Sequence, residues 1–117
     1  MTALDAVEVP ALFHWSPSSR RKGIERRGLV PGSLAIDRKW RPPYIALAPS
    51  PEAAWQMSGE DERGAGHPSW DLWQVWLSNV GAEAIPYDDG SAREFRVYER
   101  IYRRDLWLVG TRQRDEP

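Results

Sequence analysis

The sequence predicts a small α+β domain, in which antiparallel strands and two short helices pack around a cleft. Apolar runs of strand length recur along the chain and dominate its second half, whereas helix start signals are confined to the first half. The chain has 117 residues, of which 41% are apolar, and no internal repeat. We therefore expect a single domain spanning residues 1–117.

The first half of the chain begins with residues 1–10, which end in a proline and which we interpret as a flexible arm or an edge strand. Residues 11–15 follow as a short apolar strand. Ser16 is a suitable N-cap, and the proline after it suits the first turn of a helix over residues 17–27. Gly28 then provides a C-terminal stop for this helix.

A buried strand over residues 44–48 and a short helix over residues 51–57 complete the first half. The second half is expected to consist mainly of strands. Residues 70–78 form the clearest strand, because apolar side chains alternate along it. Further strands are expected at residues 82–85, 94–100 and 105–109, and a flexible charged tail at residues 112–117. We expect four tryptophans to build the core: Trp70, Trp73, Trp76 and Trp107.

Composition excludes several classes of protein and site. The net charge of −1 argues against a strongly basic nucleic-acid-binding face, although residues 20–27 carry a local basic cluster. The absence of cysteine excludes disulfides and thiolate metal sites, and two isolated histidines predict no metal site. Residues 1–10 lack the features of a signal peptide, and no stretch is long enough to span a membrane, so we expect a cytoplasmic protein.

Three strand-like segments each carry one polar residue that suits nucleotide chemistry. Taken in chain order, these residues are His14, Tyr44 and Glu94. A histidine can bind a sugar hydroxyl, an aromatic ring can stack on a flat base, and a carboxylate can stabilise a cationic sugar. Each residue alone is more typical of a structural or solvent-facing position, so the functional interpretation requires all three to meet in one cleft.

The residues around these three positions resemble the ADP-ribosyltransferase superfamily, in its His–Tyr–Glu branch. The matching segments are His14-Trp15-Ser16, Pro43-Tyr44-Ile45-Ala46 and Glu94-Phe95-Arg96-Val97-Tyr98. Trp55 falls eleven residues after Tyr44, where this family places a second aromatic residue. Gly28-Leu29-x-Pro31-Gly32 also resembles small bacterial and phage members of the superfamily.

The resemblance implies an ADP-ribosyltransferase-like fold, with a split sheet around an NAD cleft, and an enzyme that uses NAD as co-substrate. Such an enzyme cleaves the nicotinamide–ribose bond and transfers ADP-ribose to a protein, a nucleic acid or a small molecule. By analogy, His14 is expected to bind the adenosine ribose of NAD. Trp15 and Ser16 are expected to contribute to the same site, where the backbone of Trp15 would hold the nicotinamide amide. Tyr44 and Trp55 are expected to sandwich the nicotinamide, and Glu94 to stabilise the oxocarbenium-like sugar.

Departures from the family pattern leave alternatives open. Trp15 stands where glycine is usual, which narrows the expected pocket and favours a catalytically inactive domain that binds a nucleotide or a protein. Asp88 and Asp89 compete with Glu94 for the acidic role, and Ala92 replaces the second acidic residue of arginine-modifying members. An RNA 2′-phosphotransferase-like enzyme is a third alternative. The small size suggests a toxin or phage effector, for which an antitoxin or inhibitor protein is an expected partner.

Overall fold

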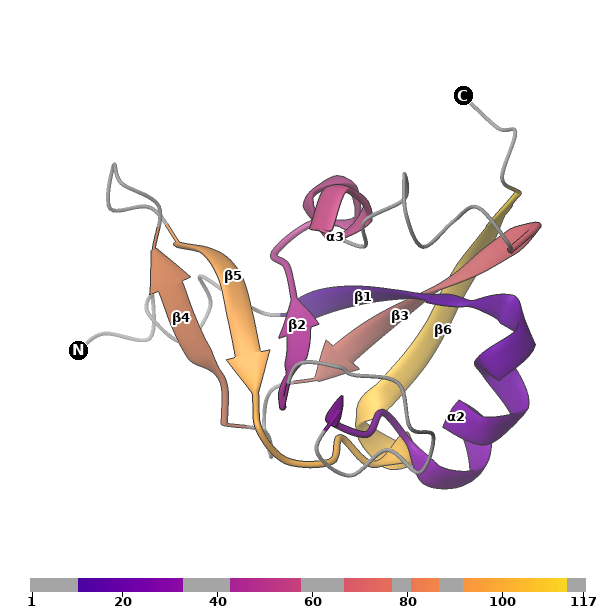
Figure 1. Cartoon of the computed structure of the whole chain (residues 1–117), viewed down its shortest axis with the longest axis horizontal. Helices are drawn as coiled ribbons and strands as arrows, with labels where there is room; N and C mark the ends of the chain where they lie inside the picture. Colours follow the sequence, from indigo (N-terminus) through magenta and orange to yellow (C-terminus); the bar gives the residue numbers. More distant parts are fainter. Residues whose placement is uncertain (1–10, 33–42, 58–66, 77–80, 87–91, 114–117) are drawn as a thin grey trace.

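The computed structural model describes residues 11–32, 43–57, 67–76, 81–86 and 92–113, which form two antiparallel sheets and two short α-helices (Figure 1). The first sheet has the order β1-β3-β6, with β1 at Ala11–Pro17, β3 at Ser69–Trp76 and β6 at Leu106–Gln113. The second has the order β2-β5-β4, with β2 at Ile45–Leu47, β5 at Ala92–Val97 and β4 at Glu83–Pro86. The α+β class predicted from the sequence is confirmed.

The helices are short, and the first begins later than the sequence predicts. A 3₁₀ turn, η1 (Ser18–Arg20), leads into α2 (Arg21–Arg27). Ser16 and the proline after it pair with β3 and therefore belong to β1, so Ser16 does not act as the N-cap. Gly28 ends α2 as predicted, with a φ of 77°. The second helix is α3 (Pro51–Met57), and a second 3₁₀ turn, η5 (Arg103–Asp105), precedes β6.

The two sheets meet where β1 passes β2, and they share one hydrophobic core (Figure 1). Phe13 and Ala48 exchange both backbone hydrogen bonds, at 2.8 and 3.0 Å. Because side chains alternate along a strand, every second residue faces the core. The sheets contribute these core residues: Leu12, Trp73, Val75 and Leu106 from the first, and Ile45, Leu47, Phe95 and Val97 from the second.

Two of the four tryptophans expected in the core lie on the surface instead. Trp70 and Trp73 are buried, but Trp76 is 42% and Trp107 58% exposed, and their rings contact each other edge-on. Trp107 pairs with Gln74 and therefore projects from the face opposite to Val75, which faces the core. The expectation of four core tryptophans was therefore wrong for this pair.

All six predicted strands are present in the described part of the chain, with shifted ends. The last strand is longer than expected: β6 continues to Gln113, and Arg112, assigned to the tail from the sequence, pairs with Trp70. Within the described residues, no helix is long and apolar enough to cross a membrane. The expected arm at residues 1–10 and the last four residues of the tail lie outside the described part.

Candidate functional site

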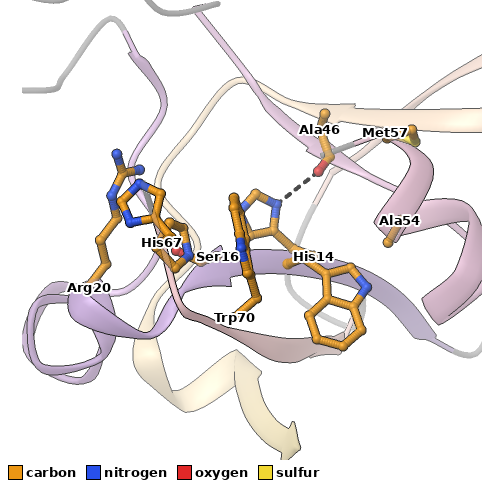
Figure 2. A pocket seen from close by; sticks show the side chains of 10 residues that line it. His14, Ser16, Arg20, Ala46, Ala54, Met57, His67 and Trp70 are labelled. Carbon is orange, nitrogen blue, oxygen red and sulfur yellow. Dashed lines mark hydrogen bonds between the residues drawn. The ribbon is translucent and has the colours of Figure 1, made fainter. Parts of the chain in front are cut away.

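A pocket of about 250 Å³ lies beside the C-terminal half of β1, where the strand approaches α3 and the end of β2 (Figure 2). Three of the site residues predicted from the sequence, His14, Trp15 and Ser16, line it directly. The other lining residues come from the end of β1, from η1, from β2, from α3 and from the segment that leads into β3: Pro17, Arg20, Ala46, Ala54, Met57, His67 and Trp70. The pocket therefore combines segments from four parts of the chain.

Trp15 lines this pocket and lies on β1, an edge strand of the first sheet. On one side, β1 pairs with β3, and on the other, Phe13 pairs with Ala48. Backbone N–H and C=O groups alternate between the two edges of a strand, so Trp15 presents its groups to the same edge as Phe13. The chain turns into α3 after Ala48, and this edge therefore opens towards the pocket at Trp15.

His14 is held at the junction of the two sheets. Its Nδ1 lies 3.0 Å from the carbonyl oxygen of Ala46, and the bond is drawn in Figure 2. Because a carbonyl oxygen only accepts, Nδ1 carries the proton in this bond. The bond fixes both the tautomer and the orientation of a half-buried ring on the wall of the pocket.

The aromatic residues near the pocket form a packed row. Trp55 is buried and contacts Trp15 and Trp70 edge-on, with ring centroids 5.1 and 5.8 Å away. The indole N–H of Trp15 donates to the carbonyl oxygen of Pro51, at 2.8 Å, which ties β1 to the first turn of α3. Trp55 thus supports the wall beside the pocket, and the guanidinium of Arg112 covers its ring at 4.2 Å.

Glu94 lies on β5 of the second sheet, on the face turned away from the core, and Tyr44, directly before β2, lies beside it. Tyr44 contacts the ring of Tyr98 at 5.8 Å, and the guanidinium of Arg96 covers the Tyr44 ring at 4.3 Å. The same guanidinium donates to a carboxylate oxygen of Glu94 at 2.5 Å. Arg96 thus contacts both Tyr44, which is expected to stack on the nicotinamide, and Glu94, which is expected to stabilise its ribose.

Charge pairing organises this sheet face. The hydrogen bond to Glu94 raises the pKa of Arg96 above its ordinary value, although burial opposes this effect. On the neighbouring strand, the hydroxyl of Tyr98 donates to Glu83, and this bond raises the pKa of Tyr98. Glu94 is therefore paired with Arg96 of β5, and Glu83 with Tyr98, the residue that follows β5.

Ala46 connects the pocket to the sheet face. It lines the pocket, accepts the bond from His14, and pairs directly with Arg96 across β2 and β5. Tyr44 lies two residues earlier, on the same side of the strand as Ala46. The structure therefore brings the three motif segments side by side, but of the three side chains only His14 lines the pocket, whereas Tyr44 and Glu94 lie on the adjoining face of the second sheet.

Three residues of the site were missed from the sequence. Arg20 and His67 line the pocket, and Arg96 bridges Tyr44 and Glu94. For Arg96, the sequence offered one signal: the alternation along β5 places its side chain on the same face as Glu94. His67 had none, because its place depends on the contact with Trp70, at 5.6 Å between ring centroids.

The alternative acidic residues Asp88 and Asp89 lie outside the described residues. Among the residues that are described, no group of three or more histidine and acidic side chains is placed to hold a metal ion. The resemblance to the ADP-ribosyltransferases rests on the sequence motifs. No protein-family model matches this chain, and no curated protein is similar to it in sequence.

Proposed function

We propose that this protein is an NAD-dependent ADP-ribosyltransferase that cleaves the nicotinamide–ribose bond and passes ADP-ribose to an acceptor. One observation carries the proposal. The strands bearing His14, Tyr44 and Glu94 are neighbours, joined by the bridge between Phe13 and Ala48 and by the pairing of β2 with β5. Segments thirty and fifty residues apart in sequence therefore adjoin one another, as one dinucleotide would require.

The pocket suits the nicotinamide end of the dinucleotide. Its volume of about 250 Å³ is below the ~300–1,000 Å³ of pockets that enclose a whole drug-sized ligand. It would therefore take one ring with its amide, while the rest of the dinucleotide extends along the neighbouring surface. The backbone N–H and C=O of Trp15 offer the donor and acceptor pair that a carboxamide needs.

The remaining roles follow from charge and stacking. Tyr44 supplies an aromatic face, and Glu94 supplies the negative charge that stabilises a sugar as it becomes cationic. In the structure, the guanidinium of Arg96 covers the Tyr44 ring and neutralises the Glu94 carboxylate. Catalysis therefore requires the Arg96 side chain to release Glu94, and a pair that stays closed would leave a domain that binds nucleotide without turnover.

The test is nicotinamide release from NAD, measured by chromatography, together with transfer of labelled ADP-ribose. We expect Glu94→Gln to lower kcat by about 100-fold or more, because the lost charge acts in the transition state, while NAD binding is retained. Glu83→Gln is the matched control, since Glu83 lies on the same face and is bonded to Tyr98. This control should retain activity within about threefold.

A thermal shift separates binding from chemistry. Because a ligand that binds only the folded state stabilises it, NAD should raise Tm, and Tyr44→Ala should reduce the shift. Absence of both release and thermal shift at millimolar NAD would refute the proposal. A thermal shift without release would instead favour the inactive nucleotide-binding domain, for which the closed pair of Glu94 and Arg96 is the supporting observation.

A further inference from the structure

The end of α2 and the segment before β6 form one continuous surface, although they are about seventy residues apart in sequence. Leu29 and Ile101 exchange both backbone hydrogen bonds, each at 2.9 Å. Gly28 approaches so closely that a Cβ there would lie 3.0 Å from the Cα of Tyr102. Arg26 and Arg27, in the last turn of α2, directly precede this close approach, and α2 also contacts η5.

Positive charge is concentrated on these two segments. Residues 20–27 and 99–105 hold eight of the sixteen basic residues of the chain but only three of its seventeen acidic residues, and one of the eight, Arg21, is paired with Asp71 from β3. One of the three, Asp105, is buried and lies 3.6 Å from Arg104. The overall charge of −1 therefore conceals a segregated basic surface, which attracts polyanions locally.

An exposed aromatic ring lies within this charge. Tyr102 is 52% exposed, and the guanidinium groups of Arg100 and Arg104 flank its ring at 5.9 and 5.3 Å. Both arginines are exposed. An accessible ring between cations is the arrangement on which proteins stack unpaired bases while neutralising the phosphates beside them.

We propose that this surface, formed by Arg26, Arg27, Arg100, Tyr102 and Arg104 and here called the arginine surface, binds single-stranded nucleic acid. The arginines contact the phosphates and Tyr102 stacks on a base. A duplex would offer only its phosphates, because its bases are already stacked, so the exposed ring favours a single strand.

The arginine surface is connected to the pocket by α2. Arg20, which lines the pocket, precedes the helix, and Arg26 and Arg27 end it. Seven residues at 1.5 Å each span about 10 Å, the length of two or three nucleotides. A nucleic-acid strand held on the arginine surface can therefore reach the pocket. The bound strand would then be the acceptor of ADP-ribose, and this part of the inference rests on the proposed function.

Binding is measured without NAD, so its outcome is independent of the proposed activity. The probe is a labelled oligo(dT) of about 12 nucleotides, followed by fluorescence anisotropy at several salt concentrations. We expect Arg26→Gln/Arg27→Gln to raise Kd about tenfold and to lower the salt slope by about 1.4, since two phosphate contacts are lost. Arg100→Gln/Arg104→Gln should act similarly, and Tyr102→Ala should raise Kd about fivefold while Tyr102→Phe retains binding.

The matched control is Gln56→Glu/Gln113→Glu, which changes the net charge by the same two units at exposed positions on α3 and β6. This control should leave Kd within about twofold, because its charges lie away from the surface. Equal weakening in the control, no binding at low salt, tighter binding of a duplex, or equally effective competition by polyglutamate would each overturn the proposal. Nicotinamide release in the same samples reports separately on the proposed function.

Discussion

At the scale of single residues, Gly28 is a position where the backbone leaves no room for a side chain. Its φ of 77° lies in the left-handed region, and a Cβ there would come within 2.0 Å of the carbonyl oxygen of Ile101. We expect Gly28→Ala to destabilise the protein by on the order of 3 kcal/mol, because it adds both backbone strain and a clash with backbone. Urea unfolding monitored by tryptophan fluorescence measures this loss.

Gly110→Ala is the control for this prediction. A Cβ at Gly110, on β6, would meet no atom of the described residues within 4 Å. Its free energy of unfolding should therefore stay within about 0.5 kcal/mol of the parent protein. Equal destabilisation by the two substitutions would contradict the role given to the close approach between Gly28 and Ile101.

At the scale of elements, Asp71 joins the start of the first helical segment to two strands. The side chain is fully buried on β3 and accepts hydrogen bonds from Ser18, Arg21 and Thr111. Burial raises the pKa of Asp71, but these bonds outweigh burial and hold the pKa below its ordinary value of 3.8. The ionised carboxylate therefore stabilises the packing of η1 and α2 on the sheet.

This pairing predicts a pH-dependent contribution to stability. Because the pKa is lower in the folded state, the contribution is complete above about pH 5 and is lost as the pH falls below 3.8. We expect Asp71→Asn to cost about 2 kcal/mol at pH 7, and the difference from the parent to shrink in acid. Urea unfolding at a series of pH values tests this, and a difference that stays constant down to pH 3 would disprove it.

At the scale of the whole molecule, the two sheets should unfold together because they share one core. Val75 of the first sheet and Val97 of the second belong to the same buried cluster. We expect Val97→Ala to reduce hydrogen-exchange protection equally in both sheets, by about 2 kcal/mol. Val109→Ala, at a position 51% exposed, should leave protection unchanged. Loss of protection confined to the second sheet would show that the sheets are separate units.

Local signals in the sequence were sufficient for the class of fold and for most of its elements. Alternation of apolar residues located the strands, prolines located the start of α3, and Gly28 located the end of α2. The same alternation placed Glu94 and Arg96 on one face of β5. These features depend on backbone sterics and on side-chain period, which act between near neighbours in the chain.

Only the tertiary structure decided which faces are covered and which distant residues meet. Alternation does not say which face of β6 is packed, so the exposure of Trp76 and Trp107 could not be predicted from their apolar character. Ser16 looked like a helix cap until strand pairing with Asp71 extended β1 through it. The cover of Arg96 over Tyr44 and the arginine surface likewise depend on strand pairing between segments far apart in sequence, which no local pattern encodes.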